Sequence, residues 1–285
     1  MIVIYGSTGF IGSHLVSYLC SGSTVAFMCS KTRVWQYKEV YEELSTYKPT
    51  SVINIAGYPT PTNIDYYEQN VDNKSNLFLT NTAGNIMLAD ICHKLNIHYV
   101  TIMSGCIFDS TLSKKPTIFS DDDKPNFYGS LYSRNRIMTE DLLSSYDNIC
   151  VVRIRMPLSS FMNKKSLINK LINYEKVTNI PNSITVLDDC IPKIMNIVDE
   201  KKTGIVNLVN SGTITNAYIC HMYKIMVNPN HKFEIVDICE IEKGDKPKRS
   251  NCIIQPSAFL GDMPDAKESV YKIFKNFKRQ KDIYC

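Results

Sequence analysis

The chain opens with Met1-Ile-Val-Ile-Tyr5 and continues with Gly6-Ser-Thr-Gly9-Phe-Ile-Gly12, an apolar stretch followed by three evenly spaced glycines. The apolar residues predict a buried strand, and Ser13 to Leu19 predict a helix after the glycines. Glycines at such a turn allow a tight backbone, close approach to phosphate and close helix–strand packing, while the first helical N–H groups bind an anion. The turn therefore predicts the pyrophosphate site of a nicotinamide dinucleotide, formed by Gly6, Ser7, Thr8, Gly9, Phe10, Ile11 and Gly12.

The first half of the chain continues with short apolar strands that alternate with segments of helical periodicity. Such alternation predicts a parallel sheet with helices on both faces. We therefore expect an α/β fold, a Rossmann doubly wound parallel sheet with a smaller C-terminal substrate-binding lobe. Further strands are expected at 24–28, 51–56, 97–103, 149–155 and 205–209. Further helices are expected at about 36–47, 81–93, 129–146, 165–174, 213–225 and 265–277.

The second half of the chain is less regular, which suggests that it forms a separate lobe. We expect a dinucleotide-binding domain at residues 1–157 and a lobe mainly formed by residues 158–285, with a segment near 204–210 returning to the sheet. Ligands of such sheets bind at the carboxyl ends of the strands, near the point where the strand order reverses.

Composition narrows the class of protein. The chain has 285 residues, a hydrophobic content of 44% and a formal net charge of +4, which is typical of a globular protein with a buried core. No block of Lys and Arg indicates nucleic-acid binding, and neither a secretory leader nor a membrane-spanning run is expected. The ten cysteines include no Cys-x-x-Cys pair and form no metal-ligand spacing with the histidines. We expect a reduced, cytoplasmic protein without a metal site.

The residues after the second expected strand bear on which dinucleotide binds. An acidic residue at this position would accept hydrogen bonds from the adenosine ribose and repel a 2′-phosphate. The sequence here is Cys29-Ser-Lys-Thr-Arg33, which contains no acid and two cations. Ser30 can donate a hydrogen bond, and Lys31 or Arg33 can neutralise a phosphate. The segment favours NADP(H), although ordinary surface charges would look the same.

Two segments predict catalytic groups. Ser104 ends the strand expected at 97–103, and Tyr132 and Arg136 lie one helical turn apart on the helix expected at 129–146. A cation near a tyrosine favours its phenolate, so the tyrosine can pass a proton to or from a carbonyl oxygen beside the nicotinamide. With 17 tyrosines in the chain, such a spacing is common by chance, and position in the fold is what selects Tyr132.

Longer segments carry a family resemblance. They read Ser-Gly-Cys-Ile-Phe at 104–108, Pro-Asn-Phe-Tyr-Gly-Ser-Leu-Tyr-Ser at 125–133, Arg-Ile-Arg-Met-Pro-Leu-Ser-Ser at 153–160 and Ile-Pro-Asn-Ser-Ile-Thr-Val-Leu-Asp at 180–188. With the glycine turn and Arg249-Ser-Asn251, they span nearly the whole chain. The chain resembles the extended short-chain dehydrogenase/reductases, and among these the dTDP-4-dehydrorhamnose reductase-like, bifunctional UDP-4-keto-6-deoxy-D-glucose 3,5-epimerase/4-reductases of UDP-L-rhamnose synthesis.

The resemblance implies roles for two residues that residue type alone would not select. Cys106 alone reads as a packed thiol at a strand end, and Lys170 as a solvated helix lysine. In the family, the matching residues are the acid/base pair that moves protons at C3 and C5 of the sugar. Ser104 and Tyr132 match the family's hydroxyl pair, whereas Arg136 stands where the family has lysine. An arginine keeps the charge but not the lysine's contacts, so either the site tolerates arginine or the reduction step is slowed or lost.

The remaining candidates line the expected cleft. Asn54, Ala56 and Gly57 follow the strand at 51–56 and are expected beside the cofactor. Amide and guanidinium groups suit the pyrophosphate and uracil of a UDP-sugar, and the candidates for these contacts are Arg155, Asn182 and Arg249.

The resemblance also implies partners. The substrate is expected to come from an upstream UDP-glucose 4,6-dehydratase, and the protein is expected to form a homodimer. Three alternatives stay open: a monofunctional dTDP-4-keto-sugar reductase, a GDP-sugar epimerase/reductase, and a non-catalytic NADP(H)-binding regulatory subunit. The last is favoured by Arg136 and disfavoured by the presence of the other four catalytic candidates.

Overall fold

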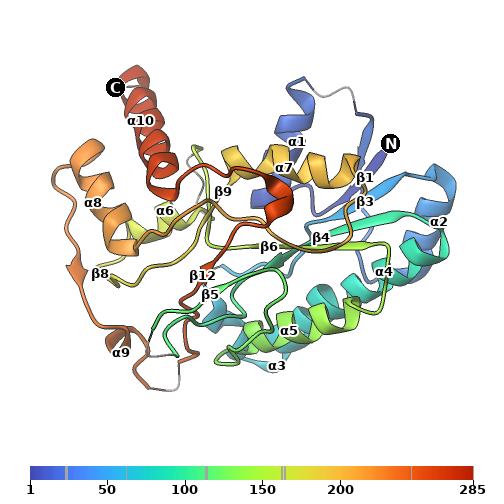
Figure 1. Cartoon of the computed structure of the whole chain (residues 1–285), viewed down its shortest axis with the longest axis horizontal. Coiled ribbons are helices and arrows are strands. Elements are labelled where there is room, and N and C mark those ends of the chain that lie inside the picture. Colours follow the sequence, from blue (N-terminus) through green and yellow to red (C-terminus); the bar gives the residue numbers. More distant parts are fainter. Residues whose placement is uncertain are drawn as a thin grey trace.

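In the computed structural model, which describes residues 1–22, 25–61, 63–112, 115–161, 163, 165–244 and 246–284, six strands form one parallel sheet. These strands are β1 (Ile2–Tyr5), β2 (Phe27–Cys29), β3 (Ser51–Asn54), β4 (His98–Ser104), β6 (Ile149–Ile154) and β10 (Gly204–Asn207). Their order is β10-β6-β4-β3-β1-β2 (Figure 1). The doubly wound α/β fold is therefore confirmed, and the strand order reverses between β1 and β3, where such folds bind ligands. Thr24, in the strand expected at 24–28, lies outside the described residues.

Helices cover both faces of this sheet because the buried strands are apolar on both sides. One face is covered by α1 (Phe10–Cys20) and α7 (Leu187–Asp199), and the other by α2 (Tyr37–Tyr47), α4 (Gly84–Lys94) and α5 (Leu131–Leu143) (Figure 1). Ile2 and Ile4 of β1 belong to the core beneath the first group, whereas Val3 and Tyr5 belong to the core beneath the second. Successive side chains of a strand point to opposite faces, so one strand supplies both cores.

The helix expected at 81–93 is part of a longer helical segment. It begins with α3 (Val71–Phe78), where Asn70 accepts a hydrogen bond from Asn73 N at 2.8 Å, and passes through a π-helical turn, η2 (Leu79–Ala83), into α4. In the π turn, the Asn81 side chain accepts a hydrogen bond from Tyr58 N at 2.8 Å. Single π turns of this kind are frequent at functional sites.

Helix α7 was not expected from the sequence. Pro192 lies inside it, and a proline within a helical pattern normally indicates its end. Tertiary packing outweighs that cost, because the apolar side chains of Leu187, Ile191 and Ile194 are buried against the sheet in the same core as α1.

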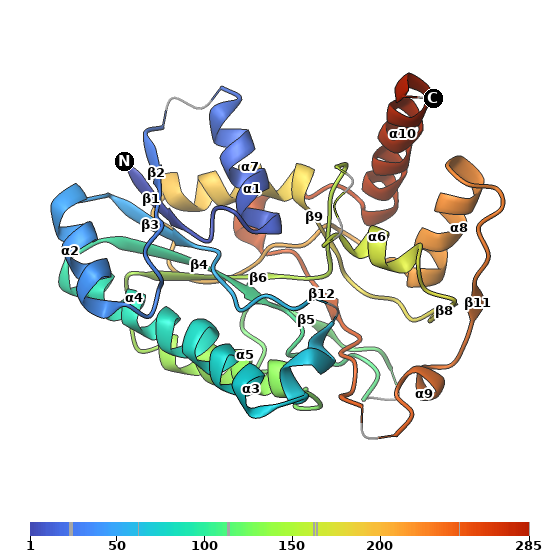
Figure 2. The same cartoon turned by 180° about the vertical axis from the view of Figure 1, so that it is seen from behind.

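A second group of elements forms a lobe beside the carboxyl ends of the strands (Figure 2). Its separate core joins three helices. The first of them, at 167–171, is shorter than the helix expected at 165–174. The division at residue 157 stays a prediction. The helices of the lobe are α6 (Leu167–Leu171), α8 (Asn216–Met226), α9 (Ile238–Ile241) and α10 (Ala266–Tyr284). Two 3-10 turns lie outside the lobe core: η1 (Ile64–Glu68), which follows β3, and η3 (Ala258–Leu260). Short parallel strand pairs are β5 (Ile118–Phe119) with β12 (Ile253–Ile254), β7 (Pro157–Leu158) with β9 (Thr185–Val186), and β8 (Lys176–Val177) with β11 (Glu234–Ile235).

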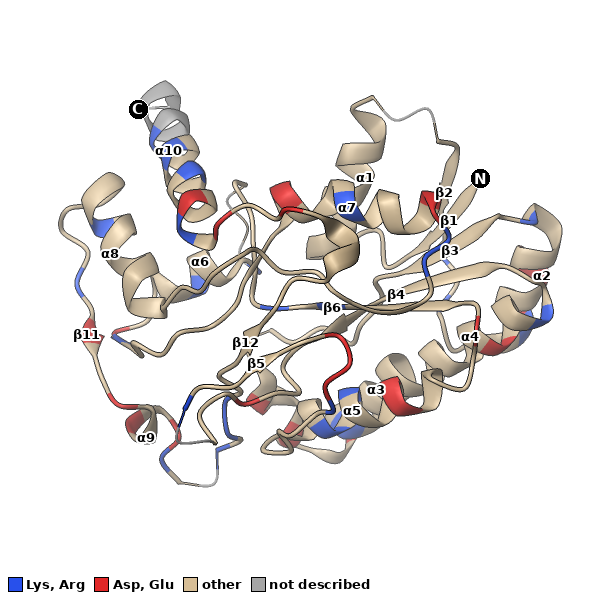
Figure 3. Cartoon of the chain, viewed as in Figure 1, with Lys and Arg blue, Asp and Glu red and all other residues tan. Residues whose placement is uncertain are grey.

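Charged residues of both signs are dispersed over the elements (Figure 3). Among the described residues, no helix has the length and apolar character to cross a bilayer, and no cluster of His, Cys, Asp and Glu could hold a metal ion. The nine cysteines in the described range are free thiols.

One buried ion pair joins the sheet to α5. The Arg153 guanidinium donates to both carboxylate oxygens of Glu140, at 3.0 and 2.5 Å, and only 1% of its side chain is exposed. Arg153 also stacks over the Phe108 ring, with 5.1 Å between the guanidinium carbon and the ring centroid. A buried charge is tolerated when it is paired and hydrogen-bonded in this way.

Glu140→Gln should lower the free energy of unfolding by about 3 kcal/mol, because it leaves the Arg153 charge buried without its counter-ion. Urea unfolding followed by circular dichroism measures this loss. Asp141→Asn, at the exposed next position of α5, is the matched control and should change little. Equal unfolding midpoints for the two variants would show that the pair does not stabilise the fold.

Candidate active site

The glycine turn meets the loop after β3 at the point where the strand order reverses. Gly6 has a positive φ of 81°, and a Cβ atom there would lie 2.5 Å from the Ala56 backbone nitrogen. At Gly12, a Cβ atom would lie 2.2 Å from the Gly6 carbonyl oxygen. Gly9 precedes α1 without a side-chain cap, so the N–H groups of the first helical turn can bind a phosphate. The turn thus fits the dinucleotide that the sequence predicts.

The segment after β2 contains an acidic neighbour that the sequence did not indicate. The Ser30 hydroxyl donates to Glu43 of α2 at 2.8 Å and accepts from Thr32 N at 3.1 Å. Its proton is therefore directed at a carboxylate rather than at a ligand. Lys31 and Arg33 are exposed beside it, and they are the cations available for a 2′-phosphate.

The Asn54 side chain supports the cleft from behind. Its amide oxygen accepts from Ala56 N at 3.0 Å, and its amide nitrogen donates to Asn85 and to the Tyr99 hydroxyl, both at 3.0 Å. Asn54 is buried, so it fixes the turn that brings Ala56 and Gly57 to the cleft.

A cleft of about 480 Å³ lies at the carboxyl ends of β3, β4 and β6, with Ile11 of α1 on its wall. It brings together residues that are far apart in the sequence. The predicted residues that line it are Ile11, Ala56, Gly57, Ser104, Cys106, Tyr132, Arg136, Arg155, Lys170 and Arg249.

The start of α5 is tied to the turn after β4. The Ser130 hydroxyl caps α5 by accepting from Ser133 N at 3.1 Å, and the Ser133 hydroxyl donates to the Cys106 carbonyl at 2.7 Å. Ser104 accepts from Cys106 N at 3.1 Å. These bonds fix Tyr132, the second residue of α5, opposite the end of β4.

Arg136 lies over the Tyr132 ring, with 5.2 Å between the guanidinium carbon and the ring centroid. Its Nη1 donates to the Met103 sulfur at 3.3 Å, and its buried Nε has no hydrogen-bond partner among the described residues. The charge therefore faces the phenol and the cleft, whereas the buried Nε is an unsatisfied donor among the described residues.

Cys106 contacts a buried arginine. Arg155 Nη1 donates to the Cys106 sulfur at 2.7 Å, and Arg155 Nη2 donates to Asn182 at 2.8 Å and to the Ser250 carbonyl at 2.5 Å. Met156, the next residue, has a φ of 43°, a strained conformation of the kind found at functional sites. Asn182 lies behind Arg155 and is only 4% exposed, so it holds the guanidinium rather than facing the cleft.

Lys170 of α6 reaches the same cleft from the lobe. Its side chain is half-buried, and burial lowers the pKa of its ammonium below the ordinary lysine value, because a low-dielectric environment disfavours the charged form. A neutral amine is thus available at lower pH than on an exposed lysine.

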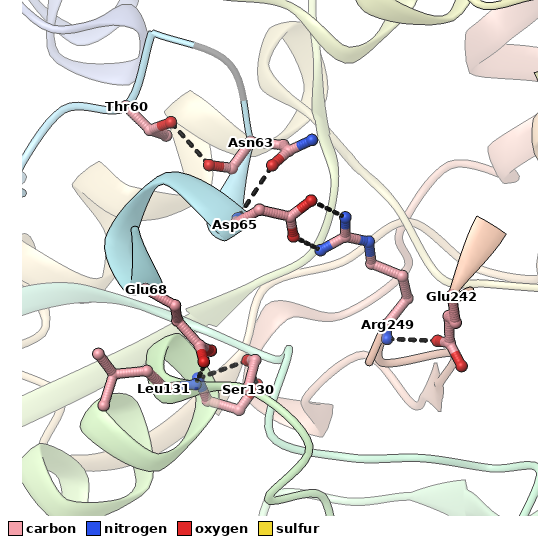
Figure 4. Close-up of polar contacts among 9 residues, drawn as sticks. Thr60, Asn63, Asp65, Glu68, Ser130, Leu131, Glu242 and Arg249 are labelled. Carbon is pink, nitrogen blue, oxygen red and sulfur yellow. Dashed lines mark hydrogen bonds and ion pairs between the residues drawn. The ribbon is translucent and has the colours of Figure 1, made fainter. Parts of the chain in front are cut away.

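Arg249 is paired with a residue that the sequence did not indicate. Its two terminal nitrogens bind the two carboxylate oxygens of Asp65, at 2.6 and 2.8 Å (Figure 4). Asp65 belongs to η1, which follows the cleft loop after β3. No motif marks η1 in the sequence, and only the tertiary structure brings it to Arg249.

A family model, described as the RmlD substrate binding domain, matches residues 1–191 of the chain. The chain belongs to the RmlD family. A bifunctional dTDP-4-dehydrorhamnose 3,5-epimerase/dTDP-4-dehydrorhamnose reductase of Arabidopsis thaliana is 34% identical over 277 residues, which cover 95% of this RmlD-family chain and 91% of the relative.

Some other relatives of this RmlD-family chain are longer. A trifunctional UDP-glucose 4,6-dehydratase/UDP-4-keto-6-deoxy-D-glucose 3,5-epimerase/UDP-4-keto-L-rhamnose-reductase of the same plant, RHM1, is 35% identical over 278 residues, covering 95% of the chain and 41% of the relative. The chain therefore spans less than half the length of that protein. The homologues of this RmlD-family chain are epimerase/reductases of UDP-L-rhamnose synthesis. The family resemblance found in the sequence is therefore confirmed.

Solved structures agree with this assignment. The L780 UDP-rhamnose synthase from Acanthamoeba polyphaga mimivirus matches with a TM-score of 0.88 and 29% identity, covering 96% of this chain and 98% of that chain. The dTDP-4-dehydrorhamnose reductase from Bacillus anthracis, solved in complex with NADP, has the same fold, with a TM-score of 0.77, 16% identity and coverage of 96% and 97%.

The half-burial of Lys170 predicts a measurable pH dependence. Because the pKa of Lys170 is lowered in the folded chain, its reductive methylation should begin to rise at a lower pH in the folded chain than in the urea-unfolded chain. Peptide mass spectrometry after methylation at a series of pH values measures this, with exposed Lys165 of the same cleft as the internal reference. A Lys170 profile that coincides in the folded and unfolded chains would contradict the environment described for it.

Proposed function

We propose that this chain is an NADPH-dependent 3,5-epimerase/4-reductase that converts UDP-4-keto-6-deoxy-D-glucose to UDP-L-rhamnose. One observation carries the proposal: Cys106 and Lys170 line the same cleft as the hydroxyls of Ser104 and Tyr132. A reductase alone needs a tyrosine and a cation, whereas an epimerase needs proton-transfer groups in addition. The cleft therefore suits both reactions on one bound sugar.

Epimerisation at C3 and C5 removes a proton beside the C4 ketone and returns one to the opposite face of the ring. In our proposal Cys106 and Lys170 move these protons, since they reach the cleft from different elements. Arg155 beside the Cys106 sulfur supplies the positive charge that a thiolate requires. Ser104 and Tyr132 donate hydrogen bonds to the C4 oxygen as negative charge develops on it.

Reduction follows at C4 in the same cleft. Bound NADPH would supply the hydride. Tyr132 gives a proton to the C4 oxygen, and Arg136 over its ring stabilises the phenolate that remains. The departure from lysine thus keeps the positive charge beside the tyrosine, although the guanidinium presents its donors in a different geometry.

We assign binding of the nucleotide to the side of the cleft that the lobe forms. Arg249 lines the cleft, and its guanidinium suits the diphosphate of UDP. Asn182 acts through Arg155 in our proposal, because its amide oxygen accepts from Arg155 and from Cys252 N at 3.0 Å. We assign the cofactor contacts to the glycine turn, to Ala56 and Gly57, and to Lys31 and Arg33.

We further propose a cytoplasmic homodimer supplied by a separate UDP-glucose 4,6-dehydratase. The names of the trifunctional plant relatives include that dehydratase, and the chain matches 41% of the length of one of them. Apolar side chains on neighbouring helical segments support a dimer beside the catalytic helix; they are Phe78, Leu79, Met138 and Leu142, which are 36–45% exposed.

The proposed function is tested by product analysis with UDP-4-keto-6-deoxy-D-glucose and NADPH. We expect oxidation of NADPH and formation of UDP-L-rhamnose, identified by chromatography and NMR. Arg136→Met should slow NADPH oxidation about 100-fold, because the phenolate loses its cation. Arg134→Met, at an exposed position of the same helix, is the matched control. The function is wrong if the native protein forms no rhamnose, and the role of Arg136 is wrong if the two variants react alike.

The cofactor preference is tested by removing both cations after β2. Lys31→Ala combined with Arg33→Ala should raise the KM for NADPH about tenfold, because the 2′-phosphate loses its charge-assisted contacts. The KM for NADH should stay within about twofold, since NADH carries no such phosphate. Steady-state kinetics with both cofactors measure the ratio, and a parallel rise for both cofactors would assign these side chains a role other than phosphate binding.

A further inference from the structure

The ion pair between Asp65 and Arg249 bridges the two parts of the molecule at the cleft. Both side chains are about one-quarter exposed, at 25% and 24%. Asp65 lies in η1, whose first turn is capped by Asn63, and Arg249 N donates to Glu242 at 2.6 Å (Figure 4). Each partner is thus anchored in its own segment, and the pair is what joins the segments here.

The same turn also contacts the helix that carries Tyr132. The Glu68 carboxylate accepts from Leu131 N, the first residue of α5, at 2.6 Å (Figure 4). The Tyr67 ring stacks on the Tyr132 ring, with centroids 5.8 Å apart and an angle of 11° between the planes. Within one turn of 3-10 helix, η1 therefore contacts both the lobe and the catalytic tyrosine.

The two terminal nitrogens of the Arg249 guanidinium can bind either of two kinds of anion. Two parallel N–H groups match a carboxylate and a phosphate equally well. Arg249 lines the cleft, and both of its terminal nitrogens are engaged by Asp65. A diphosphate that approaches this fork meets a carboxylate of like charge, so the two anions compete for one guanidinium.

We propose that Asp65 is a positioning residue that pairs with Arg249 until the diphosphate of a nucleotide sugar takes its place. The identity of that ligand rests on the proposed function. The exchange keeps Arg249 paired with an anion throughout, and it releases η1 from the lobe when the nucleotide binds. Because η1 also contacts Tyr132 and the start of α5, the exchange links occupation of the nucleotide site to the setting of the catalytic tyrosine.

Calorimetric titration of the full chain with UDP, dTDP and GDP tests the exchange. Asp65→Asn should lower the Kd of the preferred diphosphate about fivefold, because the competing charge is removed while the side chain keeps its shape. Arg249→Met should weaken binding at least about tenfold. In the double variant, the gain from Asp65→Asn should vanish, since no guanidinium remains to compete for. Glu240→Gln is the matched control, because it removes an exposed ion pair with Lys176 in the same lobe, and it should leave the Kd unchanged.

Steady-state kinetics distinguish an Asp65 that competes with the diphosphate for Arg249 from an Asp65 that only supports Arg249 structurally. Asp65→Asn should lower the KM for the nucleotide sugar about fivefold and leave kcat within about twofold, whereas loss of a brace would raise KM. Weaker binding by Asp65→Asn, with an unchanged thermal midpoint, would overturn the proposal, as would failure of all three diphosphates to bind. The outcome is separate from that of the proposed function, because a gain with dTDP or GDP alone supports the exchange even if no UDP-L-rhamnose forms.

Discussion

The hydrogen bonds of the Arg155 guanidinium join three separate segments of the chain at the cleft. Arg155 follows β6 and binds the Cys106 sulfur, the Asn182 amide and the Ser250 carbonyl, which come from the turn after β4, the lobe and the segment before β12. These partners satisfy Nη1 and Nη2, while the buried Nε has no hydrogen-bond partner among the described residues. Burying a guanidinium is costly unless its donors are hydrogen-bonded, so the three segments must meet at one point. The same contacts place positive charge beside the sulfur to which we assign proton transfer, so one interaction serves both the fold and the proposed chemistry.

Much of the fold follows from local sequence. The glycine turn, the apolar strands and their alternation with helices predicted the parallel sheet, because each of these signals lies within a few residues. Helix α7 escaped prediction because Pro192 interrupts the local helical pattern. Burial of its apolar side chains against the sheet outweighs the cost of that proline. The helical residues before position 81 also escaped prediction, and the hydrogen bond from Tyr58 N to Asn81 in the π turn is a contact that local periodicity does not show.

The site was predictable only in part, for a similar reason. Ser104, Tyr132 and Arg136 were selected by their place in the fold, and Cys106 and Lys170 by resemblance; the structure brings all five to one cleft. Partnerships between distant segments were not predictable. Glu43 reaches Ser30, and Asp65 reaches Arg249, through tertiary structure alone. Both are carboxylates beside groups that the sequence had assigned to phosphates, so the structure adds competing charges to the sequence-based account.

In our proposal, residues of one cleft transfer protons at two carbons of the sugar independently of hydride transfer. The most direct measurement is NMR of UDP-4-keto-6-deoxy-D-glucose incubated with the protein in deuterated water without NADPH. We expect deuterium at both C3 and C5 with the native chain, and strongly reduced incorporation with Cys106→Ala and with Lys170→Met. Absence of deuterium with the native chain, or native rates at both carbons with Cys106→Ala, would contradict it.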